Sequence, residues 1–108
     1  MNEIDILDIR KLVTAGSIIW TEHLALRLRE RDIKRADVVA CLQNGKIIER
    51  YPDDLPFQSC LVSGKSVDES PLHVVCSLNY GIGCCIITAY RPSSDKWLPD
   101  NTTRKVGD

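Results

Sequence analysis

Apolar residues recur at helical spacing in the first part of the chain and alternate with polar residues in the second part. Over residues 3–15 the apolar positions repeat every three or four residues, Asn2 is a suitable N-cap, and Gly16 ends the pattern. The β-branched and aromatic run at residues 17–20 predicts a small strand.

Two more helices are predicted before the periodicity changes. Thr21 is a suitable N-cap for the first, which is expected to end near Arg31. The second buries small and apolar residues and ends at Asn44-Gly45, a strong C-terminal signal. Three helices therefore precede the sheet.

From residue 46 onward the pattern is that of strands joined by short turns. The short connections favour antiparallel neighbours, because parallel strands need longer crossovers. The last strand is almost wholly apolar, which predicts a central position covered on both faces. The fold class is predicted to be α+β, with N-terminal helices followed by a four-stranded antiparallel meander sheet. The strands are expected at residues 46–51, 59–64, 72–78 and 82–90.

The chain length allows one hydrophobic core, since 108 residues are too few for a second. Residues 1–92 are expected to form a single α+β domain. Residues 93–108 are mostly polar and predict a loose C-terminal tail in which only Trp97 and Leu98 dock.

The net charge of the chain limits which partners it can attract. Lys plus Arg is 14 against 15 Asp plus Glu, a net charge of -1, so no global field attracts a polyanion. Any affinity for nucleic acid must be local. The acidic start and the lack of an apolar run of roughly 18 residues predict a cytoplasmic protein without a membrane segment. Basic residues gather in one stretch, at Arg27, Arg29, Arg31, Lys34 and Arg35.

Neither a metal nor a cofactor is expected. The five cysteines are an odd number without a CxxC pair, which is typical of reduced, buried thiols. The adjacent Cys84 and Cys85 would point to opposite faces of a strand. A Gly-rich phosphate loop and an H-E-x-x-H motif are both missing, which excludes the usual nucleotide hydrolases and zincins.

One polar stripe on the second predicted helix carries an imidazole and two guanidiniums, at His23, Arg27 and Arg31. The free amides and positive dipole at a helix start disfavour a second positive charge, so His23 is expected to be a neutral base. The alternative is an ordinary solvated helix surface, with His23 exposed or packed against Trp20.

A second histidine lies in a predicted strand. His73 alternates with Leu72 and Val74 and therefore faces away from the helices. It is either a site residue or simply solvated or paired across strands. Because His23 belongs to a helix expected on the other face, the two histidines can meet only near an edge or end of the sheet.

Tyr90 and Arg91 end the last strand, where functional side chains are common. If Cys85, Ile87 and Ala89 face the helices, Tyr90 shares the open face of the sheet with His73. Tyr90 is otherwise a core-edge residue with a bonded hydroxyl, and Arg91 a surface residue.

The chain resembles the domain-of-unknown-function family 4258 from about Ile4 to Pro92. Two departures stand out: Asp32 replaces a usual Gly, and Lys34 replaces the Ser or Thr that caps the third helix. The motifs that carry the resemblance are His23, Arg27 and Arg31; Asn44-Gly45; Tyr51-Pro52 with Asp54; L-H-V-V at residues 72–75; and I-I-T-A-Y at residues 86–90.

That family has no settled activity, but its order of helices and sheet resembles the RelE-like toxins and other small metal-independent ribonucleases. This second resemblance implies a RelE-like or barnase-like architecture and a small metal-independent ribonuclease or ribonuclease-derived toxin. RNA cleavage needs a base, cations and an acid. His23 or His73 would be the base, Arg27 and Arg31 the cations, and Tyr90 the acid.

Substrate binding would involve Arg31 and Arg91, and the expected partners are RNA or an antitoxin-like protein. The alternative is a non-catalytic toxin-like or protein-binding accessory module that uses the same surface. Homodimerisation through an exposed sheet edge is a third hypothesis.

Overall fold

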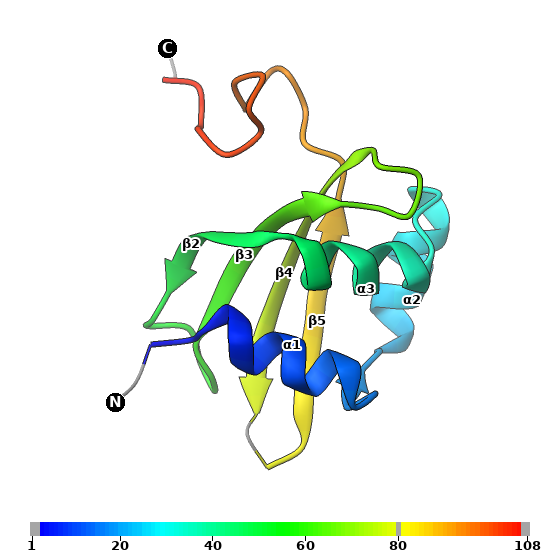
Figure 1. Ribbon diagram of the computed structural model, residues 1–108, viewed down its shortest axis with the longest axis vertical. Coiled ribbons are helices and arrows are strands. Elements are labelled where there is room, and N and C mark those ends of the chain that lie inside the picture. The colour runs from blue at the N-terminus through cyan, green and yellow to red at the C-terminus, as the bar shows by residue number, and fades with distance from the viewer. Residues whose placement is uncertain (1–2, 80, 107–108) are drawn as a thin grey trace.

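A computed structural model describes residues 3–79 and 81–106 (Figure 1). This part of the chain is an α+β fold whose helices precede the meander, as the hydrophobic pattern predicts. No helix within it is long and apolar enough to span a membrane. The elements in chain order are α1 (Ile6–Thr14), β1 (Ile18–Ile19), α2 (Glu22–Glu30), α3 (Arg35–Asn44), β2 (Lys46–Tyr51), β3 (Ser59–Lys65), β4 (Pro71–Asn79) and β5 (Gly83–Tyr90).

The sheet has the order β1-β5-β4-β3-β2. Its four long strands form the predicted antiparallel meander. The prediction of four strands was wrong, because β1 adds a fifth that runs parallel to β5. A strand of two residues is too short for alternation to reveal its partner. Gly83 permits the approach, since a Cβ there would lie 2.4 Å from the Ser17 carbonyl oxygen.

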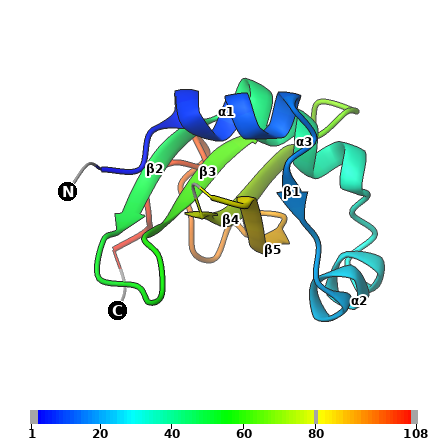
Figure 2. The same ribbon diagram turned by 90° about the horizontal axis from the view of Figure 1, so that it is seen from below.

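The helices lie in two places (Figure 2). α1 and α3 cover one face of the sheet, where Ile9 and Val38 are fully buried. α2 lies beside β5 at the sheet edge and buries Leu24 and Leu28 in the same core. The N-cap of α1 is Asp5, whose carboxylate accepts a hydrogen bond from the Leu7 amide. The expected cap Asn2 lies outside the described residues.

A β-bulge changes which residues of β5 face the helices. The β4–β5 register shifts between Val75 and Cys76, so one extra residue of β5 is left unpaired. Ile86 and Ala89 consequently both enter the helix-side core, while Ile87 is 46% exposed. The expectation that Cys85 and Ile87 face the helices is wrong, because it assumed unbroken alternation.

Residues 92–106, here called the C-terminal segment, lie at the end of the sheet where β5 ends (Figure 1), on the side away from α1 and α3 (Figure 2). Trp97 is 2% exposed and forms an isolated β-bridge with Arg104. Leu98, the other expected docking residue, is 39% exposed. Contacts from Asn101 and Arg104 to the sheet were not anticipated.

The two departures from the family pattern fall at the α2–α3 junction. Asp32 has φ 55°, a left-handed conformation that glycine adopts without steric cost. Lys34 is the N-cap of α3 and its ammonium cannot accept a hydrogen bond. Its backbone amide donates to the Asp37 carboxylate at 2.9 Å, and its carbonyl accepts from the Asp37 amide at 2.9 Å.

Lys34→Ser should therefore stabilise the fold by about 1 kcal/mol, because a serine hydroxyl can accept from the Asp37 amide and complete a capping box. Urea unfolding of wild type and variant measures the difference. Lys34→Ala is the matched control and should bring no such gain. Equal stabilisation by Ser and Ala would contradict the capping argument.

Candidate functional site

One line of paired residues crosses the meander and carries most of its polar chemistry. Lys46 pairs with Ser63, Ser63 with His73, and His73 with Tyr90, one residue from each strand from β2 to β5. We call these four residues the cross-strand row. It lies on the sheet face that the C-terminal segment covers, as the His73 contacts below show. His73 and Tyr90 share one sheet face and are also direct partners, but the C-terminal segment covers this face, which was expected to be open.

His73 is fully buried and bonded through both ring nitrogens. Nε2 lies 2.6 Å from the Asn101 carbonyl oxygen, and Nδ1 lies 3.3 Å from the Tyr90 hydroxyl. A carbonyl can only accept, so Nε2 carries the proton. In the neutral imidazole, Nδ1 therefore accepts from the Tyr90 hydroxyl. Of the alternatives open from sequence, cross-strand pairing is the one observed.

Aromatic rings and burial keep this pair neutral. Trp97 meets the His73 ring edge-on, with centroids 4.6 Å apart at 90°. Burial lowers the pKa of His73, and the positive charge of Arg104 adds to the effect. Burial also raises the pKa of Tyr90. A neutral imidazole bonded to an un-ionised phenol is therefore the resting state.

A second polar cluster, which sequence reasoning missed, lies beside the row. Arg104 donates to both carboxylate oxygens of Glu49, at 2.5 and 3.0 Å, and stacks over Trp97 at 4.6 Å. The Tyr51 hydroxyl donates to the same carboxylate at 2.6 Å. The Arg104 hydrogen bond is the main cause of the lowered pKa of Glu49, and burial with the Glu49 bond raises the pKa of Tyr51 to about 12.

Arg31 joins the site from the neighbouring helix. Its Nη1 donates to Thr88 Oγ1 at 3.0 Å and to the Ala89 carbonyl at 2.8 Å. Thr88 precedes Tyr90 by two residues on the same face, a spacing of about 7 Å. The guanidinium is thus one step along β5 from the His73–Tyr90 pair.

The other α2 residues stay apart from His73. Arg27 forms an exposed ion pair with Glu30 at 3.4 Å. The His23 imidazole is exposed and has no hydrogen bond or ion pair with any residue that the structure describes. Both lie on the same helix stripe as Arg31, but the structure shows no contact between them and the cross-strand row.

Arg91 forms hydrogen bonds to the loop between β3 and β4. Its Nη1 donates to Ser66 Oγ at 2.8 Å and to the carbonyls of Ser70 and Pro71 at 3.4 and 3.0 Å. The guanidinium is therefore held beneath this loop. Its position next to Tyr90 in the chain does not turn it toward His73.

A cavity of about 480 Å³ opens beside the row, under the C-terminal segment. Its size falls within the range of small-ligand sites. Among the residues described, no cluster of three or more His, Cys, Asp or Glu could hold a metal ion. The cavity is lined by Asn44, Gly45, Lys46, Ser63, Gly64, Lys65, Glu69, Pro71, Asp100 and Asn101.

The lowered pKa of His73 predicts a pH-dependent stability. Below its ordinary pKa of 6.5 the unfolded chain binds a proton before the folded chain does. Stability should consequently fall as the pH drops through this window, by up to about 1.4 kcal/mol per pH unit. The charged or titratable groups facing His73 are Tyr90 from β5, Glu49 from β2 and Arg104 from the C-terminal segment.

Urea unfolding between about pH 5 and pH 7.5 tests this linkage. His73→Gln keeps an amide N–H for the Asn101 carbonyl but cannot titrate. The variant should have the shallower slope. Equal slopes for variant and wild type would show that His73 does not contribute.

The comparisons with known proteins add one finding. Neither the curated proteins nor the solved structures gave a match to this chain. A family pattern does match residues 20–91, which include α2, α3 and all four strands of the meander. Since this is well over half of the chain, the protein belongs to the family described as Domain of unknown function (DUF4258).

Proposed function

We propose that the chain is a small metal-independent endoribonuclease of the RelE-like type that cleaves single-stranded RNA. The observation that carries the proposal is the hydrogen bond between the buried His73 and Tyr90. The Asn101 carbonyl sets the tautomer of His73, and the Arg31 guanidinium is bonded to Thr88, two residues before Tyr90. Acid-base groups with shifted pKa values are typical of catalytic sites.

The two ring nitrogens of His73 suit the two proton transfers of RNA cleavage. The substrate 2′-hydroxyl gives its proton to the Tyr90 oxygen as the Tyr90 proton moves to Nδ1 of His73. The 2′-oxygen then bonds to phosphorus and the bond to the 5′-oxygen breaks. Nε2–H supplies the proton to that leaving oxygen. The products are a 2′,3′-cyclic phosphate and a 5′-hydroxyl, and the imidazole ends neutral.

Cations near the pair would stabilise the phosphorane. Arg31 is bonded to Thr88 and Ala89 of β5, and Lys46 lies at the other end of the row. His23 and Arg27 continue the Arg31 stripe along α2, where they would contact flanking phosphates. Arg91 would contribute charge from the end of β5. A local field of this kind is required because the net charge is only -1.

The second candidate is a non-catalytic module that binds an acidic, antitoxin-like protein. It is favoured by α2, where Leu26 is 57% exposed beside the exposed His23 and Arg27. An apolar side chain flanked by cations suits a protein surface. In that case the His73–Tyr90 pair would have only a structural role.

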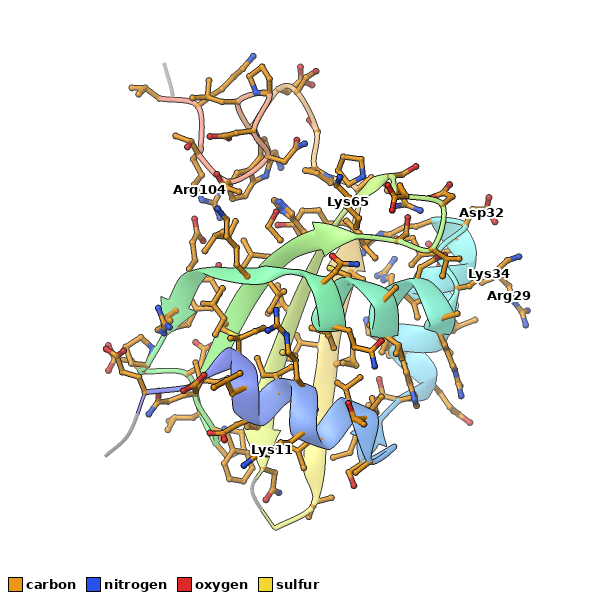
Figure 3. All side chains as sticks on the ribbon, viewed as in Figure 1. Lys11, Arg29, Asp32, Lys34, Lys65 and Arg104 are labelled. Carbon is orange, nitrogen blue, oxygen red and sulfur yellow. The ribbon has the colours of Figure 1, made fainter. Side chains whose placement is uncertain are left out.

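Cleavage of single-stranded RNA in EDTA tests the catalytic proposal. The protein should leave a 2′,3′-cyclic phosphate and spare DNA, which lacks the attacking hydroxyl. His73→Gln and Tyr90→Phe should each reduce the rate about 100-fold, because each breaks the proton path. His23→Ala and Arg27→Ala test whether the α2 stripe contributes to the rate. Lys11→Ala is the control, because Lys11 lies on α1, away from the C-terminal segment (Figure 3).

Loss of activity should appear without loss of fold, as checked by circular dichroism and urea unfolding. The Arg104→Ala variant removes the ion pair between the C-terminal segment and Glu49. If neither the wild type nor this variant cuts RNA, the ribonuclease proposal is refuted. Full activity in both His73→Gln and Tyr90→Phe would refute the assigned roles.

A further inference from the structure

The C-terminal segment covers the candidate site and lies beyond the part of the chain that the family shares. The match ends at residue 91, and the segment begins at residue 92. His73 and Tyr90 therefore belong to the shared domain, whereas Trp97 and Asn101, which cover His73, do not. The cover is separable in sequence from the residues beneath it.

Two donors of the cross-strand row converge on one oxygen of this cover. The Asn101 carbonyl accepts from His73 Nε2 at 2.6 Å and from Ser63 Oγ at 3.3 Å. These donors come from adjacent strands whose residues pair directly, so their spacing is set by the sheet. If the carbonyl moved away, both donors would point at the same vacated position. A phosphate oxygen is an acceptor that could fill it.

Charge around that position depends on whether the segment is in place. The cavity beside it is lined by the cations Lys46 and Lys65 and by the anions Glu69 and Asp100. Asp100 belongs to the segment and is bonded to the Thr102 and Thr103 amides in its own turn. Removing the segment takes Asp100 with it, which leaves two cations and one anion among the residues that line the cavity.

The clamp that holds the segment is an exposed ion pair. Arg104 reaches from the segment to Glu49 on β2 (Figure 3) and stacks over Trp97. Its side chain is 54% exposed, so releasing it does not open the helix-side core. This ion pair can therefore be removed without opening the helix-side core, while the buried Trp97 ring and the Asn101 carbonyl still hold the segment to the sheet.

We propose that Lys46, Ser63, Lys65 and His73 form a binding site for an RNA phosphate, and that residues 92–106 are a strap whose Asn101 carbonyl takes the place of a phosphate oxygen. The substrate class rests on the proposed ribonuclease function. Strap and phosphate bind the same donors, so RNA binds only the fraction of molecules in which the strap is released. The apparent dissociation constant for RNA therefore equals the intrinsic one divided by the fraction of molecules whose strap is released.

Binding of a labelled single-stranded 2′-O-methyl RNA to the full-length chain tests the strap, since this probe cannot be cleaved. Arg104→Ala and Glu49→Gln each remove the ion pair of the clamp and should tighten binding about 10-fold. The two variants change the net charge in opposite directions, so an effect common to both cannot arise from charge. Lys105→Ala removes the same charge as Arg104→Ala from the adjacent position and should not tighten binding.

The site itself is tested in the Arg104→Ala background. Adding Lys46→Gln or Lys65→Gln should weaken binding several-fold and reduce its salt dependence, while Lys11→Gln should have no comparable effect. The proposal is overturned if the clamp variants bind no tighter than wild type, or if both lysine variants bind as tightly as their parent.

The binding experiment and the cleavage experiment can fail independently, so the strap and the ribonuclease are tested separately. Tight binding by Arg104→Ala without cleavage of unmodified RNA would support the strap and refute the ribonuclease. If the wild type cleaves RNA but the clamp variants bind RNA no more tightly, the ribonuclease is supported and the strap is refuted.

Discussion

The register of β4 against its two neighbours decides what this sheet face can do. Because Ser63, His73 and Tyr90 are direct partners, a hydroxyl, an imidazole and a phenol lie in one line. A shift by one residue would turn His73 into the helix-side core and leave an imidazole among aliphatic side chains. The bulge in β5 matters for the same reason, since it keeps Ala89 in the core while Tyr90 stays opposite His73.

Burying an imidazole requires partners for both nitrogens, because an unmade hydrogen bond costs about 1–3 kcal/mol. The meander supplies one of them, the Tyr90 hydroxyl. The other comes from the Asn101 carbonyl, and the Trp97 ring packs against the imidazole with ring centroids 4.6 Å apart. The neutrality of His73 is thus a joint property of the sheet and the C-terminal segment. Moving the segment would expose Nε2 and remove part of the burial that lowers the His73 pKa.

Sequence patterns were sufficient for the helices, the meander and the face of His73, because all three follow from local periodicity. They failed where one residue breaks the period or where contacts are distant. The unpaired Ile87 reversed the expected faces of β5, and the two-residue β1 carried no pairing signal. Nothing in the local sequence around Arg104 indicates Glu49 as its partner, 55 positions away. A charged residue in a polar terminal stretch usually remains solvated.

Arg31 has a structural role at the edge of the sheet and, in the proposed ribonuclease, a chemical role as well. β1 pairs with Cys84 and Cys85, so within the described part of the chain the rest of β5 has α2 beside it and no strand partner on this side. The Arg31 guanidinium satisfies the Ala89 carbonyl and discourages pairing with another chain, since a charge at an edge opposes strand addition. It has further N–H donors beyond the two bonds of Nη1. The same bonds fix a cation near the His73–Tyr90 pair, and in the proposed ribonuclease this cation would lie close to the reacting phosphate.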